Sequence, residues 1–492
     1  MLVLAFGVLC GCGSSGLAGQ DVGQGARRPQ PRAPNIVFVL TDDLAWNLVR
    51  YMPHVLAMEQ RGATFSNYFV TDSLCCPSRA SIFTGRFPHD TGVFSNEPPN
   101  GGMQIFNANG DEQHTFATQL QARGYRTALM GKYLNGYQPA AKEGGATPYV
   151  PPGWNEWDVA GDGYPEYGYT MNSDAQVASY GDEPQDYLTD VLAEKGLSFI
   201  DQAAARRQPF MLELSTFAPH QPFTPAPRDL EDFPDLKVPR GPAFDAKTIG
   251  APAWLKDFAA LDRAQIGKLN HQFRKRAQAV QAVDRMIGEL EAELAEKGLA
   301  RNTYLVFSSD NGLHMGEHRL MTGKLTAFDS DIRVPLIVVG PGVPAGLNVR
   351  AMTENVDLCP TFDQLGGAQP PASVDGHSLV ALLHGQPATG WRKEILVEHQ
   401  GPDNGPADPD LPKRGDGNPP SYEALRTASS LYVEYATGEH EYYDLARDPF
   451  ELHNLAVDLT PVRARRLHRT LKAIAGCHGA RSEEHTSELQ SQ

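Results

Sequence analysis

The chain has 492 residues, and 41% of them are hydrophobic, which is enough for a packed globular protein. A chain of this length is long for a single core, so we expect a large domain with a smaller companion. Its formal net charge of −16 argues against a nucleic-acid partner, because nucleic acids favour basic surfaces. The same charge disfavours wide contact with a polyanionic polysaccharide.

Residues 1–34 have the composition of a leader and a tether. Met1 to Leu9 is apolar and runs into Leu-Cys-Gly-Cys ending at Cys12, which is similar to a shortened bacterial lipoprotein signal without its basic start. A plain secretory leader or a misassigned start explains it equally well. The sequence contains no run of about 20 apolar residues, the length needed to span a membrane. We therefore expect an exported protein, periplasmic or on the cell surface of a bacterium, with lipidation of Cys12 as one reading.

Short apolar runs alternate with helical patterns over residues 35–390. Strands alternating with helices predict an α/β sandwich with a large, mostly parallel central sheet flanked by helices, and ligands of such sheets bind beyond the carboxyl ends of the strands. The expected strands are Asn35–Thr41, Tyr125–Met130, Phe210–Ser215, Thr303–Ser308 and Val334–Val339, and the expected helices are His54–Arg61, Thr115–Arg123, Tyr187–Ala204 and Ala264–Lys297.

Residues 391–480 have a different pattern, which predicts a small C-terminal α+β domain. Ile395–Glu398 is a short strand, Leu431–Ala436 and Glu441–Leu445 form a hairpin, and Pro461–Ala475 is a helix. Gly401–Pro420 is rich in Pro, Gly and Asp and is expected to be an irregular loop. Residues 481–492 resemble a translated sequencing adapter and are left out of the fold prediction. The cysteines give no readable disulfide framework.

The stretch from Ser73 to Gly85 reads Cys-x-Pro-Ser-Arg, two further residues, an apolar pair and Thr-Gly. Pro77 is a natural first helical residue, and Ala80 to Phe83 continue the helix, which puts Cys75 just ahead of a helix N-terminus that attracts anions. The alternative is a buried Cys-Cys pair before an ordinary helix, with no role in catalysis. The whole stretch resembles the modification signature of the formylglycine-dependent sulfatases, a family of the alkaline-phosphatase-like superfamily.

This resemblance implies that Cys75 is oxidised to an aldehyde (formylglycine, 3-oxoalanine) by a formylglycine-generating enzyme or an equivalent maturase, and that the aldehyde hydrate attacks sulfur. The chemistry explains the unusual residue, because a plain Ser or Thr would form a stable sulfate ester. A geminal diol can instead use its second hydroxyl to re-form the aldehyde and expel sulfate.

Two polar pairs follow predicted strands: Asp42-Asp43 and Asp310-Asn311. Adjacent side chains of a strand point to opposite faces, so both members of a pair reach one ion only where the backbone turns. Each pair alone also fits a solvated turn or an Asx turn. Together with an oxygen on the modified Cys75 they form an all-oxygen set suited to Ca²⁺ first and Mg²⁺ second. The resemblance implies these five residues as metal ligands.

Cationic side chains must also surround a sulfate. The resemblance implies that Lys132 and Lys324 hold the sulfate, that His220 contacts it and protonates the leaving alcohol, and that Arg79 holds the hydrated aldehyde. His314 is a weaker substrate-binding candidate that could only shape its loop. Without the resemblance, each of these residues is more often an ordinary surface or loop side chain.

The resemblance extends from Asn35 to Ala456. Gly131–Asn135, Val150–Trp154 and Tyr187–Leu192 look like the N-acetylglucosamine-6-sulfatase and heparan endosulfatase branch. Many arylsulfatases have a histidine where this chain has Leu134, which puts activity on physiological phenols in doubt. The long basic insertion of endosulfatases is absent from the sequence.

We therefore expect a sulfuric ester hydrolase that removes sulfate from a small or terminal sulfated sugar of the N-acetylglucosamine-6-sulfate type. Two alternatives stay open. One is a phosphoester or phosphonate monoester hydrolase using the same site, because a tetrahedral dianion suits the same metal and lysines. The other is a catalytically silent sulfated-glycan binder in which Cys75 keeps its thiol.

Overall fold

The computed structural model describes residues 33–406 and 408–479. The leader with Cys12 and the adapter-like segment 481–492 lie outside the described residues. Among the helices of the described part, none is both long and apolar enough to cross a bilayer.

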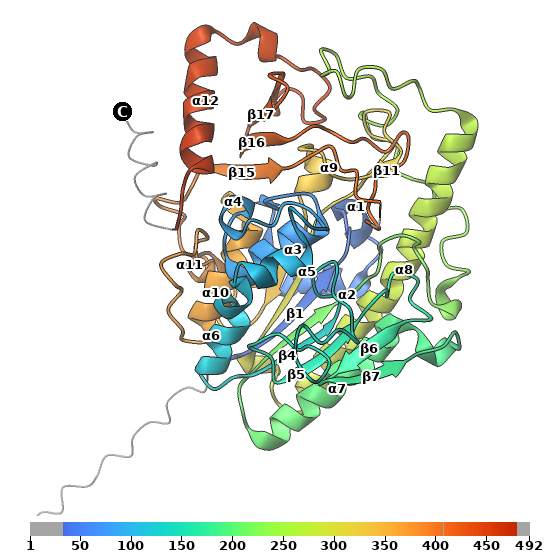
Figure 1. Ribbon diagram of the computed structural model, residues 1–492, viewed down its shortest axis with the longest axis vertical. Coiled ribbons are helices and arrows are strands. Elements are labelled where there is room, and N and C mark those ends of the chain that lie inside the picture. The colour runs from blue at the N-terminus through green and yellow to red at the C-terminus, as the bar shows by residue number, and fades with distance from the viewer. Residues whose placement is uncertain (1–32, 407, 480–492) are drawn as a thin grey trace, which may run out of the picture. The chain divides into compact units, whose positions relative to one another are not determined.

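A ten-stranded mixed sheet forms the centre of the described chain (Figure 1). Its middle strands, from β9 through β5 in the order below, are parallel to one another, whereas β12, β6 and β7 run antiparallel to their neighbours. The order across the sheet is β13 (Leu347–Val349), β2 (Ala63–Phe65), β12 (Leu336–Val339), β9 (Thr303–Ser309), β1 (Asn35–Thr41), β8 (Phe210–Ser215), β4 (Arg126–Gly131), β5 (Glu156–Ala160), β6 (Thr170–Ser173) and β7 (Gln176–Ser179).

Helices cover both faces of this sheet, and the alternation of side chains along β1 shows why. Ile36, Phe38 and Leu40 belong to one hydrophobic core, whereas Val37 and Val39 belong to the other. A strand buried on both faces has to be apolar throughout, which explains its continuous apolar run. The first core is closed by α3 (Cys75–Thr84), α6 (Phe116–Ala122) and α10 (Leu358–Leu365), and the second by α2 (Pro53–Arg61), α7 (Leu188–Arg206) and α8 (Arg263–Glu296).

The parallel register brings several strand ends to one edge of the sheet. Thr41 at the end of β1 pairs with Ser309 of β9, and Leu40 pairs with Ser215 of β8. Ser215 in turn pairs with Gly131 at the end of β4. Residues that directly follow these four strands therefore meet at the same edge, as expected for a parallel α/β sheet.

A small C-terminal domain is present, built on the antiparallel sheet β15 (Glu394–His399), β16 (Tyr422–Thr427), β17 (Ser430–Tyr435) and β18 (His440–Asp444). Ile395 and Val397 face the first core of the main sheet, whereas Leu396 packs under α12 (Pro461–Ala475), which lies along this sheet in Figure 1. Because successive side chains of a strand point to opposite faces, both faces of β15 are buried. The division at residues 390 and 391 stays a prediction.

The predicted strands and helices are all present, with ends that differ by a few residues. The outer strands β2, β13 and β5–β7 of the main sheet were not predicted, nor was β16 at the end of the long loop. One local prediction was wrong: α3 begins at Cys75 and not at Pro77, so Cys75 is its first residue. The remaining short elements are α1 (Trp46–Val49), α4 (Pro88–Thr91), α5 (Gly102–Ala108), α9 (Asp329–Ile332), α11 (Val380–Leu383), β3 (Tyr68–Phe69), β10 (His314–Met315), β11 (Thr322–Gly323) and β14 (Thr353–Glu354).

Candidate active site

The backbone turns sharply directly after β1. Asp43 has a φ of 62°, a left-handed conformation that non-glycine residues seldom adopt. The carbonyl of Asp43 accepts a hydrogen bond from the buried Arg276 of α8, which helps to hold this conformation. The turn lets two consecutive carboxylates reach the same space, as the strand-end argument requires, and both are buried.

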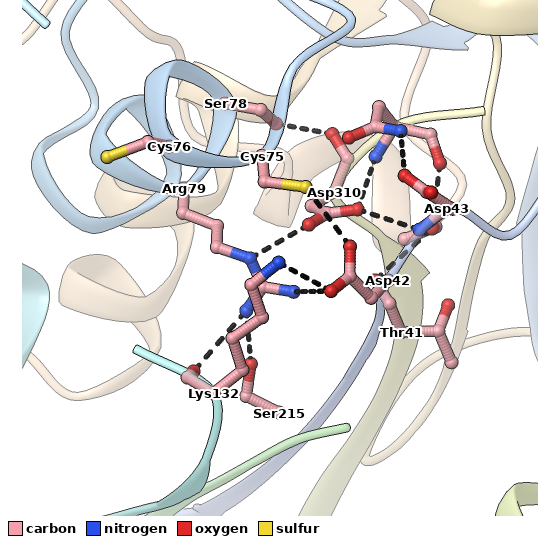
Figure 2. Close-up of polar contacts among 12 residues, drawn as sticks. Thr41, Asp42, Asp43, Cys75, Cys76, Ser78, Arg79, Lys132, Ser215 and Asp310 are labelled. Atoms are coloured by element: carbon pink, nitrogen blue, oxygen red, sulfur yellow. Dashed lines mark hydrogen bonds and ion pairs between the residues drawn. The ribbon is translucent and has the colours of Figure 1, made fainter. Parts of the chain in front are cut away.

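The second polar pair lies against the first. The backbone N–H of Asp310 donates to the carbonyl of Thr41, and Asp310 Oδ1 accepts from the backbone N–H of Asp43 at 3.1 Å. Asn311 Nδ2 donates to Asp43 Oδ1 at 2.6 Å. The ends of β1 and β9 thus place three carboxylates and one amide in a single buried cluster, shown with Asp42, Asp43 and Asp310 labelled in Figure 2.

Cys75 lies over this cluster at the first position of α3. Its Sγ is 3.2 Å from Asp42 Oδ1 and accepts from Lys324 Nζ at 2.9 Å. Burial raises the pKa of the thiol well above its usual value, and the nearby Asp410 and Asp42 add to this effect. An unmodified thiol is therefore a poor nucleophile here. The adjacent Cys76 points away from the carboxylates (Figure 2).

Arg79 is fully buried one turn further along α3 and ties the strand ends together. Its Nε donates to Asp310 Oδ2 at 2.8 Å, and one terminal nitrogen donates to Ser215 Oγ at 2.5 Å and to the carbonyl of Lys132 at 3.4 Å. The other terminal nitrogen is 3.9 Å from Asp42 Oδ2. One guanidinium thus braces residues that follow or end β1, β4, β8 and β9 (Figure 2).

Two buried lysines from distant parts of the chain contact the cluster. Lys132 Nζ donates to Asp42 Oδ2 at 2.5 Å, and Lys324 Nζ donates to Asp43 Oδ1 at 2.7 Å. Burial works against both charges, but the neighbouring carboxylates outweigh it and raise the pKa of each lysine well above its usual value. Both side chains are therefore cationic.

His220 completes the group that the sequence predicted. Its Nε2 is 3.6 Å from Asp43 Oδ2, and its Nδ1 is 2.8 Å from the carbonyl of Gln221. Burial alone lowers the pKa of His220, but the carboxylates of Asp43, Asp410 and Asp42 outweigh it and raise the pKa to about 9. The imidazole is therefore protonated near neutral pH and able to give up a proton.

The cluster fits a hard divalent cation. Asp42, Asp43, Asp310 and Asn311 supply buried oxygens, which are the ligands that Ca²⁺ and Mg²⁺ prefer. Asn311 Oδ1 is buried, and within residues 33–406 and 408–479 no donor satisfies it, whereas a cation would. Asp42, Asp43, Cys75 and His220 also place their ligand atoms within 4.8 Å of one another. The residues present therefore suit the metal site that the sequence predicted.

Two residues that sequence reasoning missed lie in the same site. Asp410 belongs to the irregular loop, yet its carboxylate is 2.7 Å from His220 Nε2, 3.0 Å from Lys324 Nζ and 3.5 Å from Cys75 Sγ. Asn96 donates to Asp410 Oδ2 at 2.9 Å, and its own oxygen accepts from the backbone N–H of Cys76. Asp410 thus occupies an anion-binding position beside Cys75, and no sequence signal marks it among the aspartates of its loop.

A cavity of about 610 Å³ opens beside Lys132. Tyr164 also lines this cavity, and its ring centroid is 4.5 Å from that of His220 and 5.0 Å from Lys132 Nζ. Leu134 lines the same cavity at the position where many arylsulfatases have a histidine. Lys132 and Tyr164 therefore link the cluster to a space large enough for a sugar.

His314 has a different position from the other predicted residues. It is buried on β10, with Nδ1 2.9 Å from the carboxylate of Asp331 and Nε2 2.7 Å from the carbonyl of Asp416. These contacts tie β10 to α9 and to the irregular loop. They support the reading in which His314 shapes the loop.

Comparisons with known proteins identify the family of the chain. The model of the sulfatase family matches residues 34–368. An N-acetylglucosamine-6-sulfatase from Capra hircus is 33% identical over 475 residues, covering 91% of this chain and 84% of that protein. An extracellular sulfatase SULF-1 homolog from Drosophila melanogaster is 33% identical over 380 residues, covering 75% of this chain and 33% of that protein.

Among solved structures, a protein in complex with its substrate D-glucosamine-2-N,6-O-disulfate superposes with a TM-score of 0.74 at 23% identity. The superposition covers 90% of this chain and 97% of that one. At this identity the likeness establishes the fold alone.

Proposed function

The chain belongs to the sulfatase family and is a sulfuric ester hydrolase acting on a sulfated sugar, and we propose that its substrate is a terminal sugar with a 6-O-sulfate of the N-acetylglucosamine type. The observation that carries the proposal is the position of Cys75. Its Sγ contacts Asp42 and Lys324 at the first residue of α3, and Lys132, which pairs with Asp42, lines a sugar-sized cavity. The N-acetylglucosamine-6-sulfatase relative supports the choice of sugar.

Oxidation of Cys75 to formylglycine is part of this proposal. The hydrated aldehyde supplies one hydroxyl for attack on sulfur and a second whose proton loss re-forms the carbonyl and releases sulfate. The buried thiol with its raised pKa supports the need for such a modification, because it could not act well unmodified. The maturase that oxidises Cys75 is then a required partner.

The proposed metal ligands are Asp42, Asp43, Asp310, Asn311 and the modified Cys75, with Ca²⁺ before Mg²⁺ as the ion. The bound ion supplies charge neutralisation at the sulfuryl oxygens and lowers the pKa of the nucleophile. Arg79 holds the ligands Asp42 and Asp310 in place through the contacts described above.

Lys132 and Lys324 hold the sulfate oxygens in the proposed reaction, and His220 protonates the leaving sugar oxygen as the S–O bond breaks. Both lysines are charged and buried beside Cys75, so they stabilise negative charge on the transferring group in a site that excludes water. The raised pKa of His220 keeps its proton available. The net reaction consumes one water and yields the free sugar hydroxyl and sulfate.

An exported location is proposed for the enzyme. The apolar start of the sequence and a relative named as an extracellular sulfatase support it. A periplasmic or cell-surface position in a bacterium and a lipid anchor at Cys12 remain expectations of the leader sequence.

The test uses the full chain, produced together with a formylglycine-generating enzyme and supplied with Ca²⁺. Mass spectrometry of the peptide containing residue 75 gives the fraction of aldehyde, and sulfate release is measured on N-acetylglucosamine-6-sulfate, internal heparan sulfate and phenyl sulfate. We expect release from the monosaccharide in preference to the polymer and the phenyl ester. Turnover of only the polymer, or of only phenyl sulfate, would refute the proposed substrate.

Two further arms of this test separate the alternatives. Phenylphosphonate esters turned over faster than matched phenyl sulfates would indicate a phosphonate monoester hydrolase. An intact Cys75 thiol together with glycan binding and no turnover would indicate a silent binder. The variant Cys75→Ala keeps the fold without a nucleophile and gives the background rate.

A further inference from the structure

The cavity beside Lys132 has an unusual charge pattern for an enzyme that binds a sulfated sugar. Lys132 is its single cationic lining residue within the described part of the chain, and this lysine already pairs with Asp42 at 2.5 Å. The other charged lining residues are Glu97 and Asp162, and both are acidic. Beyond the position of the reacting sulfate, the cavity therefore presents negative charge.

The neutral part of the lining suits an uncharged polar sugar. Amide side chains and a tyrosine provide hydrogen-bond partners for hydroxyl or acetamide groups. Within the described residues, the cavity wall contains no arginine, histidine or second lysine that could neutralise another anion. The amide groups are those of Gln104, Asn135 and Gln138, and the tyrosine is Tyr164.

The loop that carries Asp410 also reaches this cavity. Pro409 lines the cavity, and its two neighbours Asp408 and Asp410 are both acidic. Glu97 also lies against this loop, since a Cβ built on Gly405 would be 2.8 Å from Glu97 Oε2. Asp408 and Asp410 are not lining residues and their carboxylates are bound by Asn96, so Glu97 is the acidic lining residue on this side of the cavity.

From this arrangement we propose that Glu97 and Asp162 are specificity-determining residues that restrict the cavity to a sugar with one sulfate. A second sulfate on the same sugar would lie in the cavity near the carboxylates of Glu97 and Asp162 and would find no cationic partner there. Its negative charge would be repelled by theirs. A neutral acetamide avoids the repulsion, and a free amine is attracted. The inference rests on the proposed function and names the substrate class that the site excludes.

The experiment compares three substrates that differ only in the charge of the group on C2: glucosamine-6-sulfate, N-acetylglucosamine-6-sulfate and N-sulfoglucosamine-6-sulfate. We expect kcat/KM for the N-sulfo compound to be lower than for the N-acetyl compound by about tenfold or more, with the free amine at least equal to the N-acetyl compound. Raising the ionic strength should narrow the difference, because salt screens exposed charges.

The variants Glu97→Gln and Asp162→Asn should each raise the N-sulfo to N-acetyl ratio of kcat/KM by about threefold to tenfold, and the double variant should raise it further. Glu289→Gln makes the same change at an exposed acid of α8 and should leave the ratio as it is. The variants' activity on the N-acetyl compound reports whether they fold.

The outcomes separate this inference from the proposed function. If none of the three sugars releases sulfate, the proposed function fails. If all three sugars release sulfate but kcat/KM is equal for the N-sulfo and N-acetyl compounds, the charge selection by Glu97 and Asp162 is wrong while the proposed function stands. The same conclusion follows if neither the two variants nor added salt changes the N-sulfo to N-acetyl ratio of kcat/KM.

Discussion

The imidazole Nε2 of His220 lies 2.7 Å from Oδ1 of Asp410, a residue 190 positions away in the chain. The Asp410 carboxylate is also in contact with Lys324 and Asn96, and its side chain is 2% exposed. Burial alone would raise the pKa of this carboxyl, but Lys324 and His220 outweigh it and hold the pKa well below its usual value. A permanently charged carboxylate therefore occupies the position where the proposed mechanism needs a sulfate.

Removal of this carboxylate should strengthen the binding of inorganic sulfate. In Asp410→Ala, sulfate no longer competes with the Asp410 carboxylate for Lys324 and His220. We therefore expect the inhibition constant for sulfate to fall by about tenfold. The measurement is product inhibition of sulfate ester hydrolysis, with Asp235→Ala, an exposed acid elsewhere, as the control. A rise in the inhibition constant would instead show that Asp410 helps to hold the substrate.

Loss of the amide oxygen at Asn311 should weaken metal binding. We expect Asn311→Ala to lower the affinity for Ca²⁺ by roughly tenfold to a hundredfold, the range seen when even outer groups of a metal site are removed. Enzyme freed of metal by a chelator is titrated with Ca²⁺ while sulfate release is followed. Asn404→Ala, on the exposed part of the loop, is the matched control, and an unchanged titration curve for Asn311→Ala would argue against its role as a ligand.

Lys324 should contribute to the transition state more than to folding. Lys324→Met keeps much of the side-chain volume but removes the charge, and we expect kcat/KM to fall by about a hundredfold to a thousandfold. Because Lys324 also contacts Cys75, the aldehyde content of the peptide is measured in parallel. Lys256→Met changes an exposed lysine and should leave kcat/KM unchanged. A full aldehyde content with wild-type kcat/KM in Lys324→Met would exclude this role.

Glu213 should make stability depend on pH. It lies in β8, is fully buried, and both of its carboxylate oxygens lack a hydrogen-bond partner among residues 33–406 and 408–479. Burial raises its pKa to about 8, although Arg79 opposes this. Between the ordinary carboxyl pKa and about 8 the folded state keeps a proton that the unfolded state loses, so this group lowers stability as the pH rises.

The variant Glu213→Gln removes this titration. We expect little change in the free energy of unfolding at pH 5 and a stabilisation of up to about 4 kcal/mol at pH 8, where the ionised unfolded state of the wild type is most favoured. Denaturant unfolding at both pH values measures the difference. An equal effect at pH 5 and pH 8 would mean that the carboxyl does not titrate over this range.

Much of the main sheet was predictable because its strands are buried on both faces. Asn35–Thr41 and Phe210–Ser215 were predicted with the bounds that the structure has. Several outer strands escaped prediction because they are short, as are β2 and β13 with 3 residues each, or because they are exposed. All four residues of β7 are exposed, so they carry no apolar signal.

The start of α3 shows how tertiary contacts change a local rule. Pro77 favours the first helical position, but α3 begins two residues earlier at Cys75. Asn96 binds the backbone N–H of Cys76, and Ser78 binds the carbonyl of Asp310. These partners come from distant segments, so the local sequence could not show them.

The sequence by itself determined the candidates for the chemistry: Cys75, the two oxygen-bearing pairs, and the lysines and histidine around them. Those residues follow strands or open a helix, and parallel strands deliver their carboxyl ends to one edge. Only the tertiary structure decided what else enters the site. Asp410, Asn96 and the acidic lining by Glu97 and Asp162 arrive on loops, where no periodicity constrains which side chains meet, and packing between distant segments alone sets their positions.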